Sequence, residues 1–420
     1  YLPDAYIFVL VLTVIAFLAA VLGEGHSPVA VAQMWGDGFW ELLSFSMQML
    51  LVLVTGFMLA MTPPVKALLS ALARLAASPG AAIVVVSLVS LTASWINWGF
   101  GLVVGALFAK EVARRTEVDY RLLVASAYSG FLVWHGGLAG SVPLSIATPA
   151  HPFEGMIGII PTSQTIFAFY NVAIVVALFI AVPLVNRAMM PPPEESIYVD
   201  RAKLAEPDLD IGGRERPADW LETSPILSWL IGAAGLVWIV TYFAQGGGLT
   251  LNTVIFIFLI FAIILHGSPR RTLIALQEAV RGGAGIVIQF PFYSGIMAIM
   301  VQSGLAESIS VWLVGFASEV TLPFWTFLSA GIVNFFVPSG GGQWAVQAPV
   351  ILPAAEALGT DFARAAMAIA WGDAWTNMVQ PFWALPLLGI AGLQAKDIMG
   401  FCLMHLLISG VIISIGLVFL

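Results

Sequence analysis

The chain has 420 residues, of which 60% are hydrophobic and only 10% are charged. Soluble globular domains carry about 25% charged residues, so this composition excludes an ordinary soluble protein and indicates an integral membrane protein made of helices. The single cysteine, Cys402, excludes an intrachain disulfide, and the net charge of −8 comes without a basic patch for nucleic acid.

Nine apolar segments are predicted to cross the bilayer, which requires about 20 apolar residues in a helix. In chain order they are residues 5–22, 40–60, 120–148, 162–189, 225–243, 251–266, 280–300, 362–392 and 398–420.

Two further apolar stretches, 81–112 and 322–358, are too long for one helix and too short for two full crossings. Each has helix breakers or polar residues in its middle, such as Pro338 and the glycines that follow it. Broken backbone at membrane depth is tolerated only where it is buried in protein or lines a polar cavity. The sequence therefore predicts two re-entrant hairpins that enter and leave by the same face.

The basic residues orient this arrangement. With the N-terminus inside and both hairpins re-entrant, every Lys and Arg except Arg364 falls on the inner side. Because Lys and Arg collect in cytoplasmic loops, we expect a cytoplasmic N-terminus, an external C-terminus and a bacterial-type inner membrane.

The chain also indicates an inverted internal repeat. Asn97 and Asn334, each at a hairpin tip, are separated by the same number of residues as Trp134 and Trp371 in the spans that follow. The first copy covers residues 1–189 and the second covers residues 251–420. Between them, residues 190–250 form a cytoplasmic linker, or alternatively a regulatory docking segment, and a connecting span. The extra span inverts the second copy, as in many secondary transporters.

Four interruptions are expected to meet near the membrane midplane: the hairpin tips 94–101 and 334–344, and the breaks 134–141 and 371–377 within the broken spans 120–148 and 362–392. The second break is followed by Gln380 and Pro381. Free N–H groups at a half-helix N-terminus attract an anion, whereas free carbonyls and side-chain oxygens bind a cation. Since no Lys or Arg lies at these interruptions, a monovalent anion is favoured.

The candidate binding residues are small, polar or aromatic and lie at these interruptions. Those predicted for the substrate are Ser94, Asn97, Trp98, His135, Asn334, Ser339, Gly340, Gly341, Gln343 and Asn377. Those predicted for Na+ are Asn97, Ser141, Asn334, Asp373 and Thr376.

Asp373 is the only carboxylate deep within an apolar span. A charge at such a position costs at least about 2.5–3.5 kcal/mol, so it marks a functional site by default. Asp373 is predicted to bind a cation or carry a proton; a structural acid hydrated by water is the alternative. For His135, the alternatives are substrate or proton binding and simple hydrogen-bonded packing. The tryptophans at the breaks either line a pocket for a short acyl chain or pack the scaffold.

Three segments carry a resemblance to a known family. Asn334-Phe-Phe-Val-Pro-Ser-Gly-Gly-Gly-Gln-Trp-Ala-Val-Gln-Ala-Pro349 resembles the second-hairpin motif of the AtoE-type short-chain fatty acid transporters, and 370–377 and 94–101 are similar to that family too. The resemblance covers the whole chain and extends distantly to sodium/dicarboxylate carriers of the ion-transporter superfamily. The Ser-Asn-Thr motifs of those carriers are absent from both tips.

The resemblance implies a scaffold domain, a mobile transport domain, a homodimer and substrates such as acetoacetate or butyrate. We therefore predict a secondary active transporter of small monocarboxylates, coupled to Na+ or H+ by alternating access, with no other cofactor. A carrier or antiporter of another small anion is the first alternative, and a channel with re-entrant loops is the second. An enzyme is disfavoured because Asp373 has no obvious second catalytic acid.

Overall fold

The computed structural model describes residues 5–149, 151–200, 204, 216–247, 250–281 and 283–420. All regular secondary structure in these residues is helical, so the predicted all-α class is confirmed.

The first half of the chain contains ten α-helices in the described residues. They are α1 (Ala5–Leu22), α2 (Pro28–Gly38), α3 (Leu43–Ala60), α4 (Pro63–Ala73), α5 (Pro79–Ile96), α6 (Trp98–Arg115), α7 (Tyr120–Ser129), α8 (Ser141–Ile146), α9 (Glu154–Ile157) and α10 (Phe169–Ala188), with 3-10 turns η1 (Gly130–Val133) and η2 (Thr162–Gln164).

The second half repeats this order after two connecting helices. Its elements are α11 (Pro217–Thr223), α12 (Pro225–Ala244), α13 (Leu251–His266), α14 (Pro269–Arg281), α15 (Ala284–Gln302), α16 (Leu305–Val314), α17 (Leu322–Asn334), α18 (Gly340–Leu358), α19 (Phe362–Thr376), η4 (Pro381–Trp383), α20 (Ala384–Ala391) and α21 (Ala395–Phe419).

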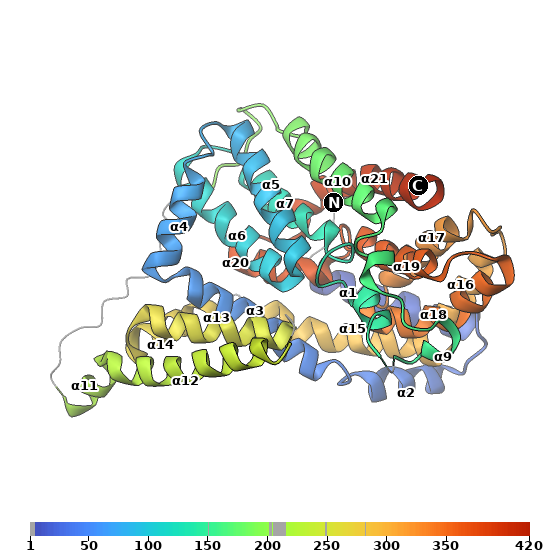
Figure 1. The fold of residues 1–420 in the computed structure, drawn as a ribbon, viewed down its shortest axis with the longest axis horizontal. Helices are drawn as coiled ribbons and strands as arrows, with labels where there is room; N and C mark the ends of the chain where they lie inside the picture. Colours follow the sequence, from blue (N-terminus) through green and yellow to red (C-terminus); the bar gives the residue numbers. More distant parts are fainter. Residues whose placement is uncertain (1–4, 150, 201–203, 205–215, 248–249, 282) are drawn as a thin grey trace.

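The helices form two groups, with α12 to α15 along the lower side in Figure 1 and α5, α6, α7 and α10 above them. The packing is reciprocal between the halves: α1 contacts α15 as α13 contacts α3, and α2 contacts α15 as α14 contacts α3. Similarly, α20 packs on α6 while α8 packs on α18. This reciprocity supports the predicted internal repeat, whose boundaries stay a prediction.

The first hairpin, α5 and α6, turns at Asn97, which has an extended backbone between the two helices. Its arms pack closely, because a Cβ at Gly101 would lie 2.1 Å from Ser94 Oγ. The second hairpin turns between Asn334 and Gly340, where Pro338 prevents continuation of α17. Both hairpins thus lie where the sequence predicts them, but α5 and α6 have 18 residues each and are longer than expected for short re-entrant arms.

The two broken spans are interrupted at different positions along the chain of each half. After α7 the chain continues through η1 and turns to α8, so the first break agrees with the predicted 134–141. In contrast, α19 continues through Gly372 to Thr376, so the second interruption lies at 377–380 instead of the predicted 371–377. Gly372 does not break the helix; it lets α19 approach α17, because a Cβ there would lie 2.4 Å from Phe327 O.

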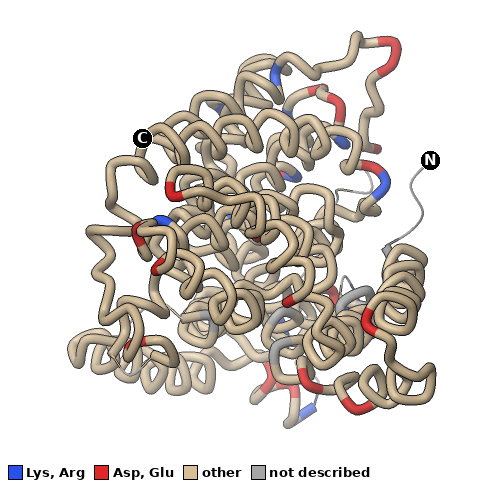
Figure 2. The backbone as a smooth tube through the Cα atoms, turned by 90° about the vertical axis from the view of Figure 1, so that its right-hand side faces the viewer, with Lys and Arg blue, Asp and Glu red and all other residues tan. Residues whose placement is uncertain are grey.

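Single helices account for fewer crossings than the nine predicted. Among the described residues, α5, α10, α12 and α21 are individually long and apolar enough to span a bilayer, and the bent pairs α3–α4 and α15–α16 raise the number to six. One of these four, α5, was assigned to a hairpin. Several of the other predicted crossings correspond to shorter apolar helices. Figure 2 shows that charged residues are few and lie mostly near the edges of the molecule. The orientation of the termini stays a prediction.

Part of the predicted linker is docked on the helices. Ile197 O accepts a hydrogen bond from Tyr120 N at 2.9 Å, and Ile197 N donates to Asp119 Oδ2 at 2.8 Å. Arg114 Nη2 donates to Leu204 O at 2.6 Å. The segment therefore contacts the junction of α6 and α7, while residues 205–215 lie outside the described part; whether it is a plain linker or a regulatory docking segment stays a prediction.

Candidate binding site at the helix interruptions

The second hairpin tip meets the second broken span through Asn334. Its Nδ2 lies 2.9 Å from Asp373 O, 3.0 Å from Thr376 Oγ1 and 2.8 Å from Asn377 Oδ1. All four residues are buried. Three oxygen atoms from the last turn of α19 thus surround one atom of the hairpin tip, which brings together four of the residues predicted from sequence.

Asp373 lies in the middle of this group and is fully buried. Its Oδ1 accepts a hydrogen bond from Asn377 Nδ2 at 3.1 Å, whereas Oδ2 has no hydrogen-bond partner among the described residues. No Lys, Arg or His of the described residues pairs with it. Since buried carboxylates are normally paired or bound to a cation, this environment suits a cation or a proton.

The N-terminus of α18 faces the first broken span. A Cβ on Gly340 would lie 2.5 Å from His135 Nε2 and 3.2 Å from Ser141 Cβ, whereas Gly341 has open space around it. Ser339 caps the helix through a weak bond from Gly342 N at 3.4 Å. The first amides of α18 have no acceptor within the helix, as at helix N-termini that bind anions. Gly340, at the start of α18, thus lies beside His135 and Ser141.

His135 is held by one ring nitrogen. Its Nδ1 lies 2.7 Å from Ala370 O, and because a carbonyl can only accept, Nδ1 carries the proton. The other nitrogen, Nε2, is buried without a hydrogen-bond partner in the described residues and lies toward Gly340. The bond to Ala370 O gives Nδ1 a structural role, whereas Nε2 can still bind a polar group at the second hairpin tip.

The first hairpin tip has a different arrangement. Asn97 Oδ1 accepts hydrogen bonds from Gly99 N at 3.0 Å and Phe100 N at 3.1 Å, so Asn97 caps α6. Ser94 Oγ is buried and has no partner in the described part of the chain. No hydrogen bond of the described residues joins Ser94 or Asn97 to the group around Asn334.

Gln343 is mainly structural. Its Nε2 donates to Ala330 O at 2.6 Å and to Gln347 Oε1 at 2.9 Å, and Gln347 continues the chain of bonds to Ser310 and Ser329. These contacts tie α18 to α16 and α17. Only Gln343 Oε1, which has no partner among the described residues, is left for a ligand.

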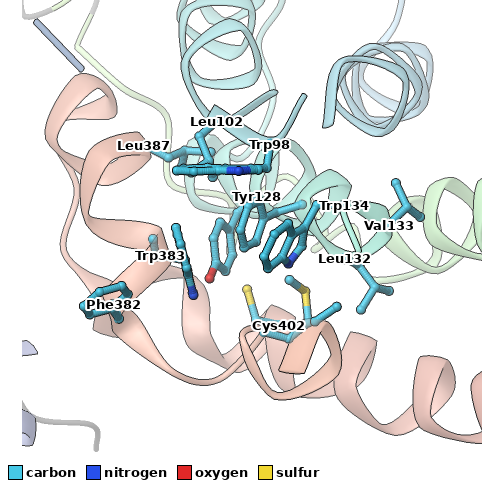
Figure 3. Close-up of a cluster of buried hydrophobic side chains, with 14 of the residues drawn as sticks. Trp98, Leu102, Tyr128, Leu132, Val133, Trp134, Phe382, Trp383, Leu387 and Cys402 are labelled. Carbon is cyan, nitrogen blue, oxygen red and sulfur yellow. The ribbon is translucent and has the colours of Figure 1, made fainter. Parts of the chain in front are cut away.

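The tryptophans pack against one another. Trp98 lies 5.0 Å from Trp383 between ring centroids, and Trp134 lies 5.7 Å from Trp383. Figure 3 shows Trp98, Trp134 and Trp383 gathered around Tyr128. These rings are at most 9% exposed, so the structure favours scaffold packing over lining of a substrate pocket. The cluster joins the first hairpin tip to the second break.

Two residues at the site were not predicted. Asn171 Nδ2 donates to Gly136 O at 3.1 Å, and its Oδ1 accepts from Trp371 Nε1 at 2.9 Å, so one side chain holds both broken spans. Tyr128 donates to Asn377 O at 2.6 Å. Asn171 had a detectable signal, because it is an amide inside a predicted apolar span.

The described residues contain no cluster of three or more His, Cys, Asp or Glu side chains that could hold a metal ion. Transition-metal sites are usually built from such ligands. Any cation bound at Asn334 and α19 would instead have carbonyl, hydroxyl, amide and carboxylate oxygens as ligands, which is the chemistry of alkali-cation sites in transporters.

The chain resembles known proteins over its whole length. A family model described as short chain fatty acid transporter matches residues 1–420. Two proteins, each named as a candidate short-chain fatty acid transporter, are 46% identical: one from Escherichia coli (strain K12), covering 99% of this chain and 96% of the relative, and one from Haemophilus influenzae (Rd), covering 100% and 97%. The solved YdaH transporter of Alcanivorax borkumensis is 18% identical over 99% of this chain and 97% of its own, with a TM-score of 0.43. The family model and the two relatives show that the chain belongs to the short-chain fatty acid transporter family.

Proposed function

We propose that the protein is a secondary active transporter of short-chain fatty acids that couples uptake to Na+ by alternating access. Family membership supports the substrate class. The choice of Na+ as the coupling ion rests on three oxygens that surround Asn334 Nδ2, all within 3.0 Å.

An amide NH2 group has two hydrogens, so it cannot donate fully to three acceptors. The nitrogen and oxygen of an Asn amide are also assigned from their hydrogen bonds and can exchange by rotation. If the Asn334 amide rotates, Oδ1 joins Asp373 O, Thr376 Oγ1 and Asn377 Oδ1 in one group of four oxygens. Such a group suits Na+, and the buried Asp373 carboxylate supplies the balancing charge.

The carboxylate of the substrate is proposed to bind at the N-terminus of α18. The first amides of α18 have no acceptor within the helix, and the helix dipole favours an anion there. Because no Lys or Arg lies at the four interruptions, a bound cation would offset the charge of the anion. This arrangement explains why binding of a monovalent acid and of Na+ would be coupled.

Proton coupling is the second candidate, since Asp373 Oδ2 is buried and has no hydrogen-bond partner in the described residues. Protonation of this carboxyl would remove the need for a cation beside it. The other predicted features, namely a scaffold domain, a mobile transport domain and a homodimer, follow from the family resemblance and stay predictions.

Uptake of labelled butyrate into proteoliposomes tests the proposal, with Na+ and pH gradients imposed separately. We expect a Na+ gradient to drive accumulation, and Asp373→Asn to lower this uptake by roughly 100-fold, because a buried charged partner is worth about 2–5 kcal/mol. Asp361→Asn is the matched control, since Asp361 is exposed at the other end of α19. Uptake driven only by the pH gradient would show that the coupling ion is H+ and not Na+. Normal Na+-driven uptake by Asp373→Asn would refute the assigned site.

A further inference from the structure

One buried nitrogen beside the proposed anion site has no role in the Na+ and carboxylate contacts described above. His135 Nε2 is fully buried and has no hydrogen-bond partner among the described residues. It lies at the start of α18, because a Cβ on Gly340 would be 2.5 Å from it. Since a buried polar atom without a partner is costly, this nitrogen marks a place where a ligand atom is expected.

The other ring nitrogen of His135 fixes the chemistry of this place. Nδ1 lies 2.7 Å from Ala370 O, and it carries the proton because a carbonyl oxygen only accepts. In a neutral imidazole the second nitrogen then has a lone pair and no hydrogen. His135 Nε2 is therefore an acceptor, which can bind an O–H or N–H group but not the oxygen of a carboxylate or a ketone.

The surroundings of His135 favour this neutral form. A charged imidazolium would be fully buried, and no Asp or Glu of the described residues forms an ion pair with it. Burial of a charge without a partner is strongly unfavourable. The positive end of the α18 dipole lies on the Gly340 side of the ring and also disfavours a second proton on Nε2.

The first turn of α18 supplies the opposite chemistry. Gln343 N donates to Ser339 O at 2.7 Å, and Gly342 N makes a weak bond to Ser339 Oγ at 3.4 Å. The amides of Gly340 and Gly341 have no acceptor within the helix. Donors for a carboxylate thus lie beside an acceptor for a hydrogen. A ligand that satisfies both has a carboxylate and a hydroxyl group a short distance apart.

We propose that the preferred substrates are short hydroxy acids, whose hydroxyl group donates to His135 Nε2 while the carboxylate binds the first amides of α18. This inference rests on the anion site of the proposed function and adds a specificity-determining residue to it. A plain fatty acid leaves Nε2 without a partner. A keto acid does the same, since its carbonyl has no hydrogen to donate.

The conformation described here has this nitrogen closed. Gly340 is buried and covers Nε2, whereas the next residue, Gly341, is exposed and has open space at its Cβ position. A shift of the first turn of α18 therefore opens the nitrogen to a ligand. Such a shift belongs to a hairpin tip that opens and closes during alternating access.

Calorimetric titration of the purified full chain in detergent, in Na+ buffer, tests this inference. The ligands are butyrate, its three isomers with a hydroxyl on the second, third or fourth carbon, and the keto acids with the carbonyl on the second or third carbon. We expect at least one hydroxy acid to bind about threefold to tenfold more tightly than butyrate, which is the worth of one hydrogen bond. Each keto acid should bind no more tightly than butyrate. Without an acceptor in the site, a hydroxyl group would weaken binding, because it loses its water on burial.

Two substitutions of the same ring separate its two nitrogens. The amide of His135→Asn can still donate to Ala370 O but does not reach the place of Nε2, so the preference for the hydroxy acid should disappear. His135→Gln places an amide oxygen near the position of Nε2 and should keep part of the preference. His405→Asn is the matched control, since His405 is a buried histidine bound to Asn186 and should not affect the ratio of the two affinities.

The outcomes separate this inference from the proposed function. Uptake of labelled butyrate, together with hydroxy acids that bind no more tightly than butyrate, would overturn the hydroxyl assignment alone. Tighter binding of a keto acid would show that Nε2 donates, and would overturn it too. Retention of the hydroxyl preference by His135→Asn, with an unchanged thermal unfolding midpoint, would remove His135 from the assignment. Absence of binding by all of these acids would refute the anion site, and the inference with it.

Discussion

The two hairpin tips carry an asparagine at equivalent positions, but the two side chains have different tasks. Asn97 uses Oδ1 to cap α6, its own second arm. Asn334 instead reaches across to the last turn of α19, with Nδ2 bound to three oxygens. The two halves therefore share an asparagine at the hairpin tip, but the residues around each asparagine determine what its side chain binds.

The residues opposite the two tips explain this difference. Asp373, Thr376 and Asn377 follow Asn334 by 39, 42 and 43 residues. The residues that follow Asn97 by the same intervals are Gly136, Ala139 and Gly140. A Cβ on Gly136 would lie 2.5 Å from Trp371 Cζ2, and one on Gly140 would lie 2.4 Å from His135 O. Close packing therefore excludes a larger side chain at Gly136 and at Gly140, the counterparts of Asp373 and Asn377. The comparison indicates one oxygen-rich site in the second half and a tightly packed turn in the first.

Replacing each asparagine in turn is the most direct test of the difference between Asn97 and Asn334. Asn334→Ala leaves Thr376 Oγ1 and Asn377 Oδ1 without the donor that Asn334 supplies, each at a cost of about 1–3 kcal/mol, so we expect Na+-driven butyrate uptake to fall by roughly 100-fold. Asn97→Ala removes only a helix cap, worth about 1 kcal/mol, and should retain most uptake. Equal losses of uptake in correctly folded variants would contradict the asymmetry.

Substitution of two adjacent glycines, Gly340 and Gly341, tests the position of the anion site. Gly340→Ala would place a methyl group 2.5 Å from His135 Nε2, whereas Gly341→Ala meets nothing within 4 Å. Because overpacking by one methyl group costs about 1–3 kcal/mol, we expect the KM for butyrate to rise roughly tenfold in Gly340→Ala. Gly341→Ala should change it less than twofold. The two variants are compared in the same proteoliposome uptake assay, and similar KM values would show that α18 and His135 are not in close contact.

The smallest expected effect concerns the residue that joins the halves. Asn171→Ala removes bonds to Gly136 O, Ile166 O and Trp371 Nε1, and we expect the free energy of unfolding to fall by about 1–3 kcal/mol. Thermal unfolding in detergent measures this loss. Asn252→Ala, at an exposed amide on α13, is the control and should be near neutral. A stability equal to that of the control would mean that Asn171 does not hold the broken spans together.

The family resemblance predicted from the motifs at 334–349, 370–377 and 94–101 is confirmed over the whole chain, and with it a transporter rather than an enzyme. The positions of both hairpins and of the first break were also predicted correctly. The second break was predicted at 371–377, followed by Gln380 and Pro381, and in the structure it lies at 377–380. Gly372, inside the predicted break, is a packing glycine between α19 and α17.

The sequence by itself determined the all-helical membrane class, the two hairpin tips and the candidate residues around Asp373. These follow from local chemistry: apolar runs form helices in a bilayer, and Pro and Gly interrupt them. Only the tertiary structure decided that Asn334, and not Asn97, reaches α19, that Asn171 joins the two broken spans, and that the tryptophans pack together. Such partnerships depend on which helices lie side by side, and no local pattern records contacts between residues that are hundreds of positions apart.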